Sequence, residues 1–185
     1  FGTSGAVVTD LGSSTDTGNS LLIQPDGRIL MLGYAQLDQN NPNLRTPIIV
    51  RYNTNGTVDT SFGTDGKLVV TIGTFYGTQI ALQSDGRLVI VSGTNHGQYV
   101  AVRYDANGKN TDPSFGTNGV AVVPSFADDF FSFGCSDIVI QPDQKIVVVG
   151  TEKNQGNFTD FVIARFNSNG TPDTSFIANG IFIMD

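Results

Sequence analysis

The chain has 185 residues, which allows one ordinary domain and hardly two. Hydrophobic residues make up 39% of it and charged residues 15%, so the composition is that of a folded chain and not of a disordered one. Acidic residues outnumber basic residues 17 to 10, and the formal charge of −7 argues against nucleic acid as a partner. No apolar run is long enough for membrane insertion.

The first five residues introduce a motif that returns three times along the chain. Phe1-Gly-Thr-Ser-Gly recurs as Phe62-Gly-Thr-Asp-Gly, as Phe115-Gly-Thr-Asn-Gly and, in altered form, as Phe176-Ile-Ala-Asn-Gly. A fixed unit of this length predicts a repeat architecture, in which each unit is one supersecondary structure.

Two further blocks lie between these motifs. The first reads Gln-Pro-Asp-Gly-Arg at Gln24, Gln-Ser-Asp-Gly-Arg at Gln83 and Gln-Pro-Asp-Gln-Lys at Gln141. The second is an Arg-Tyr or Arg-Phe pair followed by Asn-Thr-Asn-Gly, Asp-Ala-Asn-Gly or Asn-Ser-Asn-Gly. Both blocks are turn sequences between short apolar runs, so each unit is predicted to hold four strands, in the first unit 20–24, 28–33, 47–52 and 67–71. Gln144 stands where the other hairpins have glycine, which predicts a different or looser turn there.

These blocks resemble the delta-60 repeat family, β-propeller repeats of bacterial and mostly exported proteins. The family pattern has an Asp-x-Ser-Phe-Gly-x-x-Gly turn, a Gln-Pro-Asp-Gly-Lys/Arg hairpin and an Ala-Arg-Tyr-Asn strand end, and the likeness covers nearly the whole chain. Four-stranded repeats of this length are also typical of propeller blades on general grounds. The predicted fold class is therefore all-β, with tandem four-stranded antiparallel propeller-type blades. The resemblance implies no biochemical activity.

Residues 1–185 are predicted to form a single repeat domain with blades at about 20–71, 78–124 and 136–185. Residues 1–11 are expected to be an orphan outer strand, because the strand after each Phe-Gly turn is the outermost of its blade in related propellers. Since the chain begins at Phe1 without methionine or a signal-like segment, we expect an excised piece. Three blades cannot close a ring, which leaves three solutions: a longer array, a six-bladed ring of two copies, or end-to-end donation of the N-terminal strand.

Repeated charged and aromatic residues are the first candidates for chemistry. Each blade has an arginine followed by an aspartate: Arg51 with Asp59, Arg103 with Asp112, and Arg165 with Asp173. An anion-binding ring is one interpretation, and structural pairing of each arginine with its aspartate is the preferred one, because repetition in every unit indicates a structural need. The phenylalanines of the recurring turn, Phe62, Phe115 and Phe176, are predicted to plug the core between blades.

The Asn-Gly turns offer oxygen atoms in an order that is similar to calcium loops. They carry at most two carboxylates each, so ordinary Asx turns are favoured, with Asp105 and Asp112 as the best calcium candidates. Asp128 and Asp129 are interpreted as a solvated loop. The single histidine, His96, and the single cysteine, Cys135, have no recognisable orienting partner. We therefore predict no catalytic, cofactor-binding or metal site and no cofactor.

The sequence therefore favours a non-enzymatic structural or interaction module of an exported or cell-surface protein. Its partners would be itself, further blades of a longer chain, or an extracellular protein or glycan. The loops that vary between blades would carry partner contacts: 35–45, 95–98, 124–137 and 152–160. The alternative is a propeller that binds glycan or calcium, or acts as a catalyst, through loops on one face of its ring.

Overall fold

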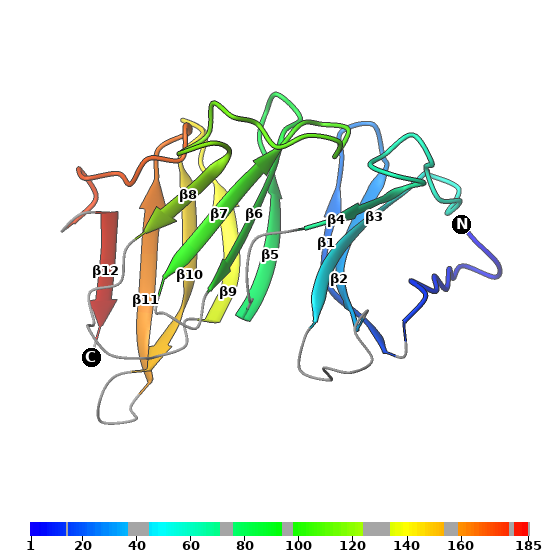
Figure 1. The fold of residues 1–185 in the computed structure, drawn as a ribbon, viewed down its shortest axis with the longest axis horizontal. Coiled ribbons are helices and arrows are strands. Elements are labelled where there is room, and N and C mark those ends of the chain that lie inside the picture. The colour runs from blue at the N-terminus through cyan, green and yellow to red at the C-terminus, as the bar shows by residue number, and fades with distance from the viewer. Residues whose placement is uncertain are drawn as a thin grey trace. The chain divides into compact units, whose positions relative to one another are not determined.

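The computed structural model describes residues 1–13, 15–36, 45–70, 76–93, 98–123, 134–153, 159–177 and 180–184. These residues form twelve β-strands and no α-helix (Figure 1). Within the described segments, no helix could cross a membrane. The strands are β1 (Asp16–Ile23), β2 (Ile29–Ala35), β3 (Thr46–Tyr52), β4 (Lys67–Val69), β5 (Tyr76–Leu82), β6 (Leu88–Gly93), β7 (Tyr99–Tyr104), β8 (Val120–Val123), β9 (Gly134–Ile140), β10 (Ile146–Lys153), β11 (Thr159–Phe166) and β12 (Ile181–Met184).

The twelve strands form three antiparallel sheets of four strands each, in the order in which they follow along the chain. We call β1–β4 blade 1, β5–β8 blade 2 and β9–β12 blade 3. The strand after each Phe-Gly turn, β4, β8 or β12, lies at one edge of its sheet. The predicted fold class of three four-stranded antiparallel blades is thereby confirmed.

The chain divides into two compact units. Unit 1 comprises residues 1–71 together with 107–110, and unit 2 comprises residues 72–106 and 111–185. Blade 1 therefore lies in unit 1, while blades 2 and 3 form unit 2.

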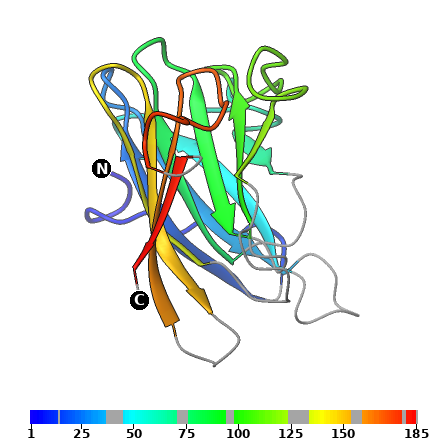
Figure 2. The same cartoon turned by 90° about the vertical axis from the view of Figure 1, so that its left-hand side faces the viewer.

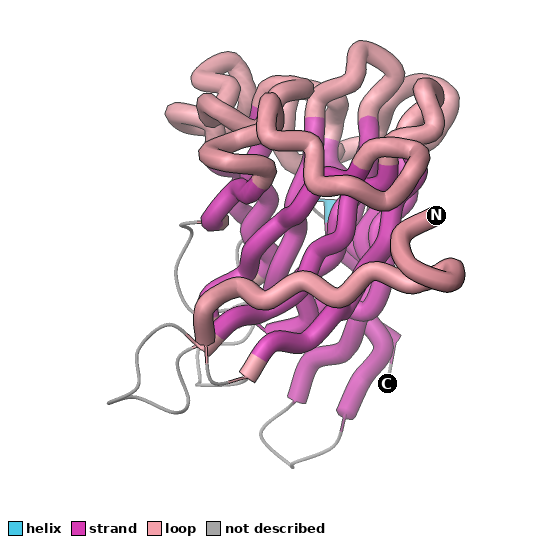
Figure 3. Tube along the Cα trace, turned by 90° about the vertical axis from the view of Figure 1, so that its right-hand side faces the viewer, coloured by secondary structure: helices cyan, strands magenta, loops and turns pink. Residues whose placement is uncertain are grey.

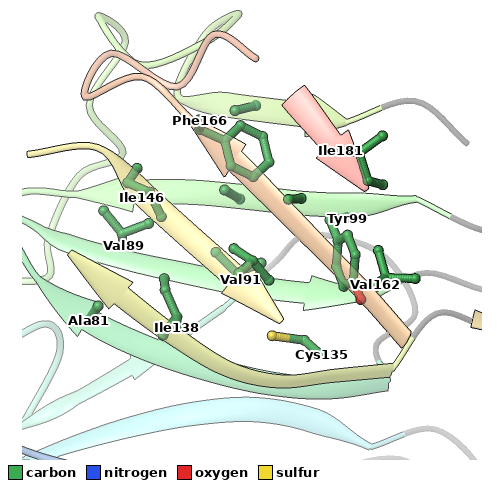
Figure 4. Packing of buried hydrophobic residues seen from close by; sticks show 14 of the residues in the cluster. Ala81, Val89, Val91, Tyr99, Cys135, Ile138, Ile146, Val162, Phe166 and Ile181 are labelled. Carbon is green, nitrogen blue, oxygen red and sulfur yellow. The ribbon is translucent and has the colours of Figure 1, made fainter. Parts of the chain in front are cut away.

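Unit 2 has a hydrophobic core between the sheets of blades 2 and 3 (Figure 4). Alternate residues of β6 and β7 point into it from blade 2, and alternate residues of β10 and β11 from blade 3, as period-two side-chain alternation requires. Phe115 and Phe166 are fully buried there and are among its largest side chains. Figure 2 shows the strands of blade 3 side by side, with β12 at the edge of the sheet.

Unit 1 has a smaller core on one face of blade 1. It contains Ala35, Ile48, Val50 and Tyr52. The N-terminal segment, residues 1–11, covers this core: Val7 and Leu11 pack against it, and Thr9 Oγ1 lies 2.7 Å from Tyr52 OH.

Residues 1–11, predicted as an orphan outer strand, form no strand in the structure (Figure 3). Within the described part of the chain, their one ladder contact is the bridge between Ala6 and Thr3. The equivalent residues of β4 and β8 pair with the third strand of their own blade, and β4 already occupies that place in blade 1. The segment therefore lies on the face of blade 1, and its predicted place in another blade stays a prediction.

The first hairpin turn is the same in all three blades, which corrects one expectation. Gln144 was expected to impose a different or looser turn, yet it takes a φ of 66°, in the same left-handed region as Gly27 and Gly86. Its N–H donates to Gln141 O at 2.8 Å, as the two glycines donate to Gln24 O and Gln83 O at 2.9 Å. The Gln144 side chain accepts a hydrogen bond from Ser84 N at 3.0 Å, and this contact helps to hold the turn.

Candidate functional site

The same cluster of four side chains lies at the end of the third strand of each blade. In blade 2, Arg103 Nε donates to Asp112 Oδ2 at 2.9 Å, and the guanidinium stacks on the Phe115 ring with its carbon 4.7 Å from the ring centroid. Ser114 donates from Oγ and from its main-chain N to Asp112 Oδ1, at 2.7 and 3.0 Å. This arrangement combines a charge-assisted hydrogen bond with a cation–π contact.

Blades 1 and 3 repeat the cluster with nearly equal distances. The Arg Nε to Asp Oδ2 distance is 2.8 Å from Arg51 to Asp59 and 2.7 Å from Arg165 to Asp173. The stacking distances are 4.7 Å on Phe62 and 4.4 Å on Phe176. The predicted pairing of each arginine with its aspartate is therefore present in all three blades.

A second cation reaches each of these aspartates from the first hairpin, and the sequence analysis missed it. Arg87 Nε lies 3.0 Å from Asp112 Oδ2, and Lys145 Nζ lies 3.0 Å from Asp173 Oδ2. In blade 1, Arg28 Nη1 lies 3.4 Å from Asp59 Oδ2. The signal that could have revealed it is the basic residue that ends the hairpin block in every unit.

The pKa of each paired aspartate is lowered from its ordinary value. For Asp59 and Asp173 the main cause is the hydrogen bond from the neighbouring serine, Ser61 or Ser175. For Asp112 burial opposes ionisation most strongly, but the hydrogen bonds from Ser114 and the charges of Arg103 and Arg87 together outweigh it, so its pKa also falls. All three aspartates are thus ionised at neutral pH and neutralised by their partners.

In unit 2, the Phe-Gly turn of blade 2 (residues 115–119) docks on the Asn-Gly turn of blade 3 (residues 167–170). Gly116 N donates to Asn169 O at 2.7 Å, and Arg103 Nη1 donates to Ser168 O at 2.8 Å. The Phe115 ring packs against Gly170, where a Cβ would come within 2.9 Å of two ring carbons. Arg103 therefore has two roles, within its own blade and toward the next.

Above this contact, a polar groove of about 480 Å³ runs between the turns of blades 2 and 3. Its lining includes Arg103, whose Nη1 also donates to Gln83 Oε1 at 3.0 Å. The equivalent oxygens, Gln24 Oε1 and Gln141 Oε1, are buried without a hydrogen-bond partner in the described structure. The groove is also lined by Ser84, Asp85, Arg87, Ser114, Asp143, Gln144, Ser168 and Asn169.

The turns use their oxygen atoms internally, which disfavours the calcium interpretation. Asn55 Oδ1 accepts from Thr57 N at 3.0 Å and from Thr57 Oγ1 at 2.8 Å, and Asn169 makes the same two bonds with Thr171. These are the predicted Asx turns. Both carboxylate oxygens of Asp112 are committed to arginine and serine donors. Among the residues described, no three acidic, histidine or cysteine side chains are placed to hold a metal.

Cys135 lies in the core of unit 2, where burial and, to a smaller extent, the nearby Asp137 carboxylate raise the pKa of its thiol to about 12. A protonated, buried thiol is a poor nucleophile. His96 and the acidic pair Asp128 and Asp129 lie outside the described residues, as do most of the loops that vary between blades.

The match to a family model agrees with propeller-type blades. The family model described as "Domain of unknown function (DUF5122) beta-propeller" matches residues 24–62 and 141–176, which lie in blades 1 and 3. A solved structure of a fucose lectin from Kordia zhangzhouensis, in complex with methyl-fucoside, resembles the chain with a TM-score of 0.47 and 11% identity, over 89% of this chain and 96% of the lectin chain. No curated protein matches the sequence.

The sheets and the family match together define a repeat protein with propeller-type blades. The match agrees with the propeller part of the resemblance to delta-60 repeats and leaves that family name itself a prediction.

Proposed function

We propose that the chain is a non-catalytic interaction module of an exported or cell-surface protein, whose end blades are completed by further blades or by a neighbouring subunit. The observation that carries this proposal is the repeated cluster of arginine, aspartate, serine and phenylalanine. Each member is engaged by the others or by the next turn, as in Arg103 with Asp112 and Ser168. Within the described residues, groups committed in this way serve the packing of the blades, which supports a structural role for the cluster.

The number of blades supports the second half of the proposal. Propellers close with about four to eight blades, and the described residues form three four-stranded sheets. A closed ring therefore needs sheets from elsewhere in a longer chain or from another copy. The negative charge of −7 fits a protein partner better than nucleic acid. The scarcity of Lys and Glu beside abundant Asn, Thr, Ser and Gly suits an exported protein.

The test is the mass of the purified chain by light scattering over a wide range of concentrations. We expect the mass to rise with concentration, because blade 3 leaves apolar side chains exposed on its outer face. A discrete dimer would indicate a closed six-bladed ring, and continuous growth would indicate an open chain of subunits. A monomer at every concentration would contradict completion by a second copy.

The polar groove of unit 2 favours glycan binding as a second candidate function. Its lining of amide, hydroxyl and guanidinium groups can both donate to and accept from sugar hydroxyls. We expect the amide resonances of Gln83, Ser84 and Asn169 to shift on titration with at least one simple methyl glycoside, and Gln83→Ala to abolish the shifts. The matched control is Gln24→Ala, the equivalent residue of blade 1. If no methyl glycoside at millimolar concentration shifts these resonances, this candidate fails.

A further inference from the structure

At its described residues, Phe176, Ile177 and Gly180, the Phe-Gly turn of blade 3 keeps the backbone features of the turns that dock elsewhere in the chain. Ile177 takes a φ of 48°, close to the 53° of Gly63 and the 55° of Gly116. Gly180 N donates to Phe176 O at 3.1 Å, and the corresponding bonds of the other two turns are 2.9 Å long. A β-branched residue rarely adopts this backbone conformation. Ile177 adopts it nevertheless, so the left-handed backbone at this position is retained although isoleucine replaces glycine.

The docking contacts made by the other two turns are missing here. Phe62 and Phe115 are fully buried, whereas Phe176 is partly exposed. The arginine side chains show the same trend, with 3% exposure for Arg51, 7% for Arg103 and 19% for Arg165. Gly63 N and Gly116 N donate to main-chain carbonyls, and Ile177 N makes no such bond within the described part of the chain.

The outer face of blade 3 is uncovered as well. Along β11, residues alternate between buried and exposed, and Val162, Ala164 and Phe166 face the core. On the opposite face Phe161 is 50% exposed, and its cross-strand neighbour Met184 is 55% exposed. Arg165 lies on this same face by the alternation of the strand, so the open turn and the open apolar surface are continuous.

The Asn-Gly turn of blade 1, residues 53–56, is bound by the N-terminal segment and not by a Phe-Gly turn that follows a third strand. Asn107 O and Asn169 O accept from Gly63 N and Gly116 N, at 2.8 and 2.7 Å. Asn55 O accepts instead from Gly2 N at 2.8 Å.

The aromatic contact of the docked turns is absent at this third turn. A Cβ on Gly108 or Gly170 would meet a phenylalanine ring, but on Gly56 it would meet Gly2 and Val7. Phe1, the equivalent aromatic residue, is exposed. The N-terminal segment thus supplies the hydrogen bond of a docked turn without its ring.

We propose that the Phe-Gly turn of blade 3 docks on the Asn53–Gly56 turn of a second copy of the chain and displaces that copy's residues 1–11. This rests on the proposed function as a module completed by a neighbouring subunit. By analogy with blades 2 and 3, Ile177 N donates to Asn55 O, Phe176 covers Gly56, and Arg165 donates to Thr54 O. Removal of Val7 and Leu11 also frees the core face of blade 1 for the exposed face of blade 3.

The test is disulfide trapping between two single variants, Ile177→Cys and Asn55→Cys. The contact joins the main chains of these two positions, so both substitutions leave the bonding atoms in place. Cys135 is buried, and the raised pKa of its thiol keeps it unreactive. When the two variants are mixed under mild oxidation, we expect the mixed disulfide to exceed both homodimers clearly.

Two further variants make the result specific. Phe176→Asp in the Ile177→Cys chain should reduce the mixed disulfide to the level of random collision. Val7→Asp in the Asn55→Cys chain loosens the N-terminal segment and should raise the yield severalfold. Far-UV circular dichroism establishes that each variant is folded.

The proposal is overturned if the mixed disulfide does not exceed the homodimers, or if Phe176→Asp leaves its yield unchanged. The proposed function fails separately, through its own test by light scattering. If the wild-type chain self-associates but the mixed disulfide is not favoured, the proposed function stands, and the contact between copies lies at another surface than the Phe-Gly turn of blade 3.

Discussion

Replacing Phe115 by alanine is expected to lower the free energy of unfolding by about 3–5 kcal/mol. The ring is fully buried in the core of unit 2, stacks under the Arg103 guanidinium and fills the space beside Gly170, so its loss leaves a cavity that the surrounding sheets cannot close. Urea unfolding followed by far-UV circular dichroism measures the change by linear extrapolation.

Phe176→Ala is the matched control for this prediction. The ring stacks on Arg165 in the same way, but it is partly exposed, so its loss should cost only about 1–2 kcal/mol at a protein concentration where the chain is monomeric. Equal losses for the two variants would show that Phe176 is covered in the monomer, which would contradict the open turn of blade 3.

Asp112→Asn is expected to destabilise the chain by about 3 kcal/mol, the low end of the range for removing one partner of a buried ion pair. The substitution keeps the shape of the side chain but leaves Arg103 and Arg87 facing a neutral amide. The measurement is again urea unfolding at neutral pH, where the Asp112 carboxylate is ionised because its pKa is lowered.

Asp85→Asn provides the comparison for the charge. Asp85 forms an ion pair with Arg87 at 2.7 Å, but its side chain is 47% exposed, against 11% for Asp112. Exposed pairs contribute about 0–1 kcal/mol, so this variant should stay close to wild type. A loss as large as that of Asp112→Asn would mean that exposure does not separate the two pairs.

The features within one blade were predictable from the sequence because they recur in every unit. The pairing of Arg51 with Asp59 follows from residue types that keep their spacing while the loops around them vary. A contact that every blade requires is made by the same residue types in every blade, so residues that recur at a fixed spacing predict that contact.

The features between blades were not predictable in this way. The bond from Gly116 N to Asn169 O joins main-chain atoms, so apart from the glycine it requires no particular side chain that could be recognised in the sequence. The position of residues 1–11 depends on which strand edge is free, and the repeat pattern alone suggested a strand. Gln144 misled the prediction, because its turn is defined by main-chain bonds that a non-glycine residue can also make.

Docking through the main chain has a consequence for how such chains evolve. Because the joining bond links a glycine N–H to an asparagine carbonyl and not two complementary side chains, the identity of neighbouring blades is weakly specified. A duplicated or deleted unit meets an acceptable neighbour at once, without compensating substitutions. Unequal recombination can therefore change the number of blades in a single step.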